Sequence, residues 1–287
     1  MARIAILTPD VAHPYHGSRW PEVLERMAAP IRRNGGHSIA ARSWTEADDL
    51  HAFDLVLPLL AWGYPQAHDL WLERARRWEE ERVNIRNPAS VLRWDSDKSY
   101  LGDLAERGAP IVPTLYFDRL TLGAMEEARE RFGTDRLVAK PRISSGAWQT
   151  IRWRRDSTLE GGPEGAAMVQ PYLPEIERSG EVSLIYFGGG FSHAIRKVPQ
   201  PGDFRVQPEY DGVITRYEPQ ADEVEAAERV LAAVAEDLLY ARVDLVPGLG
   251  GSPELIELEL IEPDLYLQYD PENGRYFTEA VMELIGR

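Results

Sequence analysis

Three acidic residues near the C-terminus have the spacing of a metal-binding site. Glu257 and Glu259 lie two residues apart in Leu-Ile-Glu-Leu-Glu-Leu-Ile-Glu-Pro, so on a β-strand both side chains would point to one face. Asp244 lies in an earlier strand-like segment, Arg-Val-Asp-Leu-Val. Carboxylates on adjacent strands repel one another unless a cation lies between them, and such oxygen ligands suit Mg²⁺, which also binds substrate phosphates. Taken alone, Glu257 and Glu259 would be the solvated face of an edge strand, but the order of the other motifs favours the metal site.

A lysine upstream has the surroundings of a phosphate-binding group. Lys140 ends the strand-like run Leu-Val-Ala-Lys-Pro, in which a lysine rarely lacks a partner, and the small-residue loop Ile-Ser-Ser-Gly-Ala-Trp follows. A lysine beside a flexible loop can hold phosphates, so we expect Ser144, Ser145 and Gly146 to line a nucleotide site with it. Together, the lysine and the metal-binding acids indicate nucleoside triphosphate chemistry.

Composition excludes several classes of function. The 287 residues carry 47 acidic and 32 basic side chains, a net charge of −15, which argues against nucleic-acid and anionic-membrane partners but not against ATP in a local basic pocket. Disulfides, thiolate catalysis and cysteine-ligated zinc are excluded because the chain has no cysteine. The N-terminal apolar run is too short for a signal peptide, and no run approaches ~18 apolar residues, so we expect a cytoplasmic protein.

The pattern of apolar residues predicts an open α/β lobe at the N-terminus. Strands are expected over residues 4–8, 38–42 and 53–60, and helices over residues 21–33 and 64–82. Ligands bind such lobes in the loops beyond the carboxyl ends of the strands. Here those loops are residues 9–19 and 61–64.

The remainder of the chain predicts a mixture of strands and helices. Further strands are expected over residues 111–117, 137–141, 150–154, 167–171, 181–187 and 192–198, followed by the two acidic strands. Helices are expected within 90–107, where one helix would carry Lys98, and over 122–132, 222–239 and 277–285. The glycine turn 188–190 predicts a hairpin.

In this order, the motifs resemble those of the ATP-grasp superfamily of carboxylate–amine ligases. The resemblance is carried by a helix lysine (Lys98), a strand lysine with its loop (Lys140), an interlobe hinge (Gln170-Pro-Tyr-Leu-Pro-Glu175), a basic strand and arginine loop (Lys197, Arg205) and the two acidic strands. It covers residues 88–287. It implies an α/β (α+β) ATP-grasp fold with an N-terminal domain over 1–95, a small subdomain over 96–174 and a C-terminal subdomain over 175–287, the two subdomains clamping ATP.

Within the superfamily the chain looks like the glutathione-synthetase and ribosomal-modification-ligase (RimK-like) branch, and most like the cycloserine-forming ligases, or O-ureidoserine cyclo-ligases. Three stretches carry this closer resemblance: residues 62–64, 87–98 and 257–263. One departure concerns the metal strand, where glutathione synthetase has Glu-x-Asn and this chain has Glu257 and Glu259. Two glutamates still ligate Mg²⁺, with an extra negative charge that a second cation could neutralise.

The resemblance implies roles for the charged residues around ATP. Lys140 would hold the α- and β-phosphates with help from Lys98, although a solvated helix lysine is the alternative for Lys98. Lys197 and Arg205 would face the γ-phosphate and the developing acyl phosphate, and the alternative for Arg205 is a surface arginine. The acidic strands would bind one or two Mg²⁺ ions, for which Mn²⁺ could substitute.

Other roles concern the nucleoside and the substrate. Gln170, Tyr172 and Leu173 would line the adenine pocket, or form a plain linker, and either Glu175 or Glu181 would accept hydrogen bonds from the ribose. Residues on N-terminal loops could contact substrate, although solvation or local packing explains each one alone: His13, His16, Arg19, Trp62 and Tyr64. Two further expectations are that Glu262 is a helix-side or substrate-side residue, and that loop 142–149, with Trp148, closes over the phosphates.

The leading hypothesis is an ATP- and Mg²⁺-dependent carboxylate–nitrogen ligase. Its substrates would be an amino-acid-like carboxylate and a nitrogen nucleophile, either within one molecule, which gives a ring, or on two molecules, as in a dipeptide or glutathione-type ligase. The alternatives are an ATP-grasp kinase that stops at the phosphorylated product and a non-catalytic nucleotide-binding protein. Relatives are commonly dimers, so a homodimer is a further expectation of the resemblance.

Overall fold

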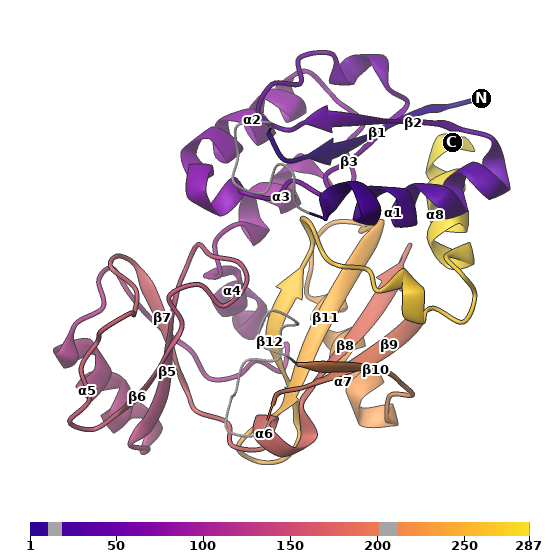
Figure 1. Cartoon of the computed structure of the whole chain (residues 1–287). Coiled ribbons are helices and arrows are strands. Elements are labelled where there is room, and N and C mark those ends of the chain that lie inside the picture. Colours follow the sequence, from indigo (N-terminus) through magenta and orange to yellow (C-terminus); the bar gives the residue numbers. More distant parts are fainter. Residues whose placement is uncertain (11–18, 201–211, 287) are drawn as a thin grey trace.

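The N-terminal lobe is a three-stranded parallel sheet with helices on both faces (Figure 1). The computed structural model describes residues 1–10, 19–200 and 212–286. The elements of this lobe are β1 (Arg3–Thr8), α1 (Trp20–Gly35), β2 (Ser38–Ser43), β3 (Leu55–Leu57), α2 (His68–Glu80) and α3 (Ala89–Asp95), with short 3-10 turns at Leu50–Ala52 and Tyr64–Ala67. Strand β1 lies between β2 and β3.

The two-residue period of β1 divides its side chains between two cores. Ile4 and Ile6 pack in one core with Met27 of α1, whereas Leu7 packs in another core with Trp71 of α2. Because both faces are covered, the strand is apolar from Ile4 to Leu7, as parallel strands usually are.

A second sheet of four antiparallel strands forms a small lobe with one covering helix (Figure 1). Its elements are β4 (Leu115–Phe117), α5 (Leu122–Phe132), β5 (Arg136–Pro141), β6 (Ile151–Arg154) and β7 (Ala167–Pro171), and the strand order is β4-β7-β5-β6. Met125 and Ala128 of α5 pack against Leu137 and Trp153, so the amphipathic helix closes the core of this lobe.

The third sheet has five antiparallel strands in the order β10-β9-β8-β11-β12. The elements are α4 (Tyr100–Glu106), α6 (Ile176–Ser179), β8 (Glu181–Phe187), β9 (Gly190–Val198), β10 (Val213–Tyr217), α7 (Ala221–Ala232), β11 (Tyr240–Pro247), β12 (Pro253–Glu259) and α8 (Arg275–Gly286), with a 3-10 turn at Leu267–Tyr269. Leu184, Val243 and Leu258 pack against α4 and α7 on one face. Residues of the opposite parity, including Asp244 and Glu257, border the cavity described below.

Most elements predicted from the sequence are present, and the differences have local causes. The strand expected over 53–60 ends before Pro58, and that expected over 111–117 begins after Pro113, because proline cannot donate to a strand ladder. Helix α7 ends at Ala232 instead of 239. Glu236 and Asp237 would lie in the last turn of the longer helix, where the helix dipole disfavours acids.

Lys98 does not lie on a helix, which corrects the prediction for this residue. It occupies a turn between α3 and α4, where the Asp97 carboxylate accepts a hydrogen bond from the Ser99 amide at 2.9 Å. Side-chain bonds of this kind favour a turn over a continuing helix. Strand β10 and the short helix α6 were not predicted.

Each of the three sheets lies within one of the domain ranges expected from the sequence, and the exact boundaries stay a prediction. Two helices cross those ranges. Helix α4 packs in the core of the five-stranded sheet through Leu101 and Leu104, and α8 packs beside α1 through Phe277 and Val281 (Figure 1). In the described parts of the chain, every helix is too short or too polar to cross a membrane.

Candidate active site

A cavity of about 900 Å³ is bordered by the four- and five-stranded sheets, by helix α1 and by residues 59–64, which follow β3. It brings together these residues singled out from the sequence: Arg19, Trp62, Tyr64, Lys98, Lys140, Ser144, Ser145, Gly146, Gln170, Tyr172, Leu173, Glu181, Lys197, Asp244, Glu257 and Glu259. Glu175 does not border it and forms an ion pair with Arg178 at 3.5 Å. His13, His16 and Arg205 lie outside the described residues.

The three predicted metal-binding carboxylates converge at one place. Asp244 on β11 is paired in register with Glu257 on β12, and Glu259 follows on the same face. One carboxylate oxygen from each of the three lies within 4.8 Å of the others. The register shifts directly after Asp244, and such a bulge changes the direction in which the strand presents its side chains.

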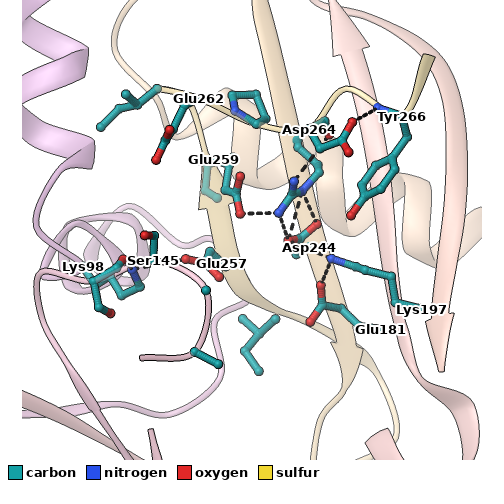
Figure 2. A pocket seen from close by; sticks show the side chains of 18 of the residues that line it. Lys98, Ser145, Glu181, Lys197, Asp244, Glu257, Glu259, Glu262, Asp264 and Tyr266 are labelled. Carbon is teal, nitrogen blue, oxygen red and sulfur yellow. Dashed lines mark hydrogen bonds and ion pairs between the residues drawn. The ribbon is translucent and has the colours of Figure 1, made fainter. Parts of the chain in front are cut away.

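An arginine missed by the sequence analysis lies among these carboxylates. Arg242 donates from Nε to Asp244 Oδ1 at 3.0 Å and from Nη2 to Asp244 Oδ2 at 3.0 Å, and its Nη2 also contacts Glu259 (Figure 2). The guanidinium is therefore a cation between Asp244 and Glu259, and these two carboxylates can lie side by side without a metal ion, so Mg²⁺ binding stays a prediction. The signal was present, because Arg242 and Asp244 are two residues apart on one strand.

Lys197 is a second buried cation in the cluster. Its Nζ contacts Glu181 and lies 3.4 Å from Asp244 Oδ2 (Figure 2). Burial lowers the pKa of Lys197, but the Asp244 and Glu181 carboxylates outweigh it and raise that pKa above its usual value. Burial raises the pKa of Glu181 to about 7. Although burial opposes it, Arg242 and Lys197 hold the pKa of Asp244 well below its usual range, so Asp244 is ionised.

Lys98 joins the metal-binding strand to the predicted phosphate loop. Its Nζ lies 3.2 Å from Glu257 Oε1 and donates to the carbonyl oxygen of Ser144 at 2.6 Å. Burial raises the pKa of Glu257, but Lys98 and Lys140 outweigh it and lower that pKa, which keeps the carboxylate ionised. The chain contains three lysines, and all three border this cavity.

The predicted adenine pocket has an apolar wall and a fixed amide. Leu173 packs in a small core with Val112 and, partly buried, Ile256. The buried Gln170 side chain donates from Nε2 to Thr114 Oγ1 at 2.9 Å, which holds its orientation. Tyr172 is buried, with the Arg136 guanidinium 4.2 Å from its ring centroid. A planar, largely apolar ligand fits such a wall.

Comparison with known proteins identifies the family. A family model described as D-cycloserine synthetase DcsG, N-terminal domain, matches residues 4–87. The cycloserine biosynthesis protein DcsG of Streptomyces lavendulae is 32% identical over 308 aligned residues, which cover 99% of each chain. The chain belongs to the DcsG family. A crystal structure of D-cycloserine synthetase DcsG has a TM-score of 0.80 at 26% identity and covers 99% of both chains.

More distant structures support the fold of this DcsG-family chain. D-alanine–D-alanine ligase from Bacillus anthracis has a TM-score of 0.70 at 17% identity, covering 100% of this chain and 98% of the ligase. The ATP-grasp ligase PsnB, in complex with a minimal precursor, Mg and ADP, has a TM-score of 0.67 at 14% identity, covering 98% and 97%. The fold is that of the ATP-grasp ligases. Family and fold together make the chain an ATP-dependent ligase and favour this function over the kinase and the non-catalytic alternatives.

Proposed function

We propose that this protein is an ATP- and Mg²⁺-dependent ligase that joins a carboxylate to a nitrogen within one amino-acid-like molecule, and so closes a ring. The observation that carries the proposal is the convergence of Asp244, Glu257 and Glu259, with carboxylate oxygens within 4.8 Å of one another, in the cavity that also contains Lys98 and Lys140. The cyclising form is supported by the full-length relationship to the cycloserine biosynthesis protein DcsG.

The donor set suits Mg²⁺. Asp244 and Glu257 have lowered pKa values, so two ionised carboxylates are ready to bind a cation, and oxygen ligands are those that Mg²⁺ prefers. Burial raises the pKa of Glu259 to about 8, and a cation beside it would favour the ionised form. A bound Mg²⁺ would supply neutralisation of phosphate charge during phosphoryl transfer.

The protein's own residues position the nucleotide. Lys140 holds the α- and β-phosphates with help from Lys98, and the loop 142–149 closes over the phosphates and excludes water from them. The hinge residues Gln170, Tyr172 and Leu173 hold the adenine, and Glu181, held by Lys197, is the better candidate than Glu175 for the ribose because it alone of the two borders the cavity.

The reaction then has two steps. A substrate carboxylate oxygen attacks the γ-phosphorus of ATP, the bond to the bridging oxygen breaks, and ADP leaves as an acyl phosphate forms. A nitrogen of the same molecule attacks the acyl carbon, inorganic phosphate leaves, and the nitrogen loses a proton. Arg242 and Lys197 provide fixed positive charge beside the reacting groups, with Arg205 as a further predicted cation, so catalysis is by positioning and electrostatics.

The test is phosphate release from ATP and Mg²⁺ with a panel of amino acids, dipeptides and O-ureido-D-serine. Release with O-ureido-D-serine alone, with a cyclic product seen by mass spectrometry, would support the cyclising ligase. Release that requires two panel members would point to an intermolecular ligase. A stable phosphorylated product with no free phosphate would instead favour the kinase. Glu257→Gln should abolish release, whereas Glu254→Gln, on the same strand but outside the cavity, should not.

A further inference from the structure

Two acidic side chains that border the cavity form no ion pair with any residue that the structure describes. Glu262 and Asp95 both border the cavity, and Glu262 Oε2 and Asp95 Oδ1 are buried without a hydrogen-bond partner among the described residues. Four other carboxylates bordering the cavity each contact a cationic side chain: Glu181 contacts Lys197, Asp244 and Glu259 contact Arg242, and Glu257 contacts Lys98. Buried polar atoms normally have a hydrogen-bond partner, so two carboxylate oxygens without one beside a cavity suit a donor on a ligand.

The position of both residues is fixed by the backbone that follows β12. Asp95, at the end of α3, is 7% exposed and accepts a hydrogen bond from the Leu260 amide through Oδ2 at 3.1 Å. Asn87 donates from Nδ2 to the Leu260 carbonyl at 2.8 Å. Glu262 follows two residues later, and in Figure 2 no dashed line joins its carboxylate to another of the residues drawn, whereas Glu259 is joined to a guanidinium. The site is therefore held in place before any ligand enters.

Tyr64 completes this acidic recess, defined by Glu262, Asp95 and Tyr64. Tyr64 borders the cavity together with both carboxylates, and burial raises the pKa of its hydroxyl well above the usual value, with Glu262 and Asp95 adding to the rise. Burial also raises the pKa of Glu262 and of Asp95 well above their usual range. A cation placed among these groups would stabilise their ionised forms.

The order of groups along β12 and the three residues that follow it places the recess at the substrate end of the cavity. Ile256 packs near the hinge residue Leu173, Glu257 and Glu259 belong to the carboxylate cluster, and Glu262 comes after them. A nucleotide with its base at the hinge and its phosphates at the cluster would leave the recess for the phosphoryl acceptor. The acceptor would then have cationic side chains on one side and unpaired carboxylates on the other, which suits a zwitterion.

We propose that the acidic recess binds the α-ammonium group of an amino-acid substrate, with Glu262 as the principal acceptor, and so directs the substrate carboxylate toward Arg242 and the carboxylate cluster. This inference rests on the proposed ligase function and specifies how its substrate is recognised. An α-hydroxy acid of the same shape lacks the positive charge and leaves the buried carboxylates unpaired, so the recess rejects it.

The test is isothermal titration calorimetry on the full chain with Mg²⁺ and a non-hydrolysable ATP analogue present. The probes are O-ureido-D-serine, D-alanine and the α-hydroxy counterpart of each. The variants are Glu262→Gln and Asp95→Asn. Glu254→Gln is the matched control, because Glu254 Oε2 is also buried without a partner and burial also raises its pKa, but Glu254 does not border the cavity. Binding of the ATP analogue alone shows that each variant is folded.

The expected result is that Glu262→Gln weakens binding of the amino acid by about 10- to 100-fold, the range for loss of a charged hydrogen bond, while Glu254→Gln does not. The hydroxy acid should bind wild type weakly, and Glu262→Gln should not weaken it further. Equal affinity of wild type and Glu262→Gln for the amino acid, with phosphate release intact, would overturn the inference and leave the ligase function standing. Absence of both amino-acid binding and phosphate release in wild type would overturn the proposed function and this inference with it.

Discussion

Arg242 and Asp244 lie two residues apart on β11, and the guanidinium chelates the carboxylate through two bonds of 3.0 Å. The same guanidinium contacts Glu259 on the neighbouring strand. This arginine, which the sequence analysis missed, thus neutralises charge on two of the three carboxylates of the cluster. Such a pair is strong because both bonds are charge-assisted and geometrically fixed.

Two replacements of Arg242 should distinguish the contribution of its planar shape to activity from the contribution of its charge to stability. Arg242→Lys keeps one positive charge but loses the planar fork, so we expect phosphate release to fall by at least about tenfold with a folded protein. Arg242→Ala removes the buried cation that Asp244 and Glu259 share and should lower the free energy of unfolding by about 3–5 kcal/mol. Steady-state kinetics and urea denaturation measure the two effects. Activity of Arg242→Lys within twofold of wild type would contradict the role given to this side chain.

Loss of Lys98 should uncouple the phosphate loop from the metal-binding strand. Lys98→Met removes both the ion pair with Glu257 and the bond to the Ser144 carbonyl. We expect the affinity for ATP analogues to fall by about tenfold or more, since hydrogen bonds to charged groups contribute about 1.5–3 kcal/mol. Calorimetry of analogue binding measures this. Lys98→Arg, which can reach the same acceptors, serves as the control and should lose less.

The Tyr100 hydroxyl should stabilise the strand that carries the two glutamates. It donates to the Leu258 carbonyl at 2.9 Å and accepts from the Leu258 amide at 2.8 Å, so it replaces a missing neighbour at the edge strand β12. Tyr100→Phe leaves two buried backbone groups unpaired and should cost about 1–3 kcal/mol of unfolding free energy. The control is Tyr186→Phe, because the buried Tyr186 hydroxyl has no hydrogen-bond partner within the described chain. If Tyr186→Phe costs as much as Tyr100→Phe, the assignment is wrong.

Stability should depend on pH through His193. This side chain is buried, its Nε2 bonds the Leu265 carbonyl at 3.0 Å, and burial lowers its pKa below 6.5. Because the unfolded chain takes up the proton more readily, the stabilisation by neutral His193 is complete above pH 6.5 and is lost as the pH falls below it. Urea denaturation between pH 7.5 and 5 should show this loss, with a slope of at most about 1.4 kcal/mol per pH unit from this one group.

The matched variant for this pH effect is His193→Gln. Burial raises the pKa values of Glu181 and Glu259, and these groups change stability in the opposite direction as pH falls, so only the difference between wild type and variant isolates the histidine. The variant should lose less stability than wild type between pH 7.5 and 5. Parallel stability curves for the two proteins would rule out the histidine as the source.

The sequence predicted best the elements with a clear pattern and a clear stop. Helix α5 and strands β7 and β8 have the predicted bounds: α5 is amphipathic and followed by Gly133, and the strands are short, largely apolar runs that end at Pro171 and before Gly188. Strand β10 was missed because most of its residues are exposed, so it has no buried face to reveal, and its pairing with β9 depends on the tertiary structure. Strands β3 and β4 and helix α7 are shorter than predicted because proline or acidic residues lie within the predicted ranges.

The site was predictable where function needs a particular residue type in a particular order. Asp244, Glu257 and Glu259 meet as expected, and Lys98 and Lys140 border the same cavity. What could not be predicted depends on which residues face each other across strands and lobes. Three features follow from packing. Glu181 pairs with Lys197, and Asp95 accepts a hydrogen bond from the Leu260 amide. Glu175 lies outside the cavity. The roles of the individual residues, including His13, His16 and Arg205, stay predictions.

The confinement of all three lysines to the cavity makes the protein unusual as a target for chemical labelling. Elsewhere on its surface, positive charge is carried by guanidinium and imidazole groups, so the ε-amines form a small set within one site. Reagents that acylate or methylate amines would therefore mark that site and the N-terminus. The number of added groups, read by intact-protein mass spectrometry, would report directly whether a nucleotide shields the cavity, without any engineered probe.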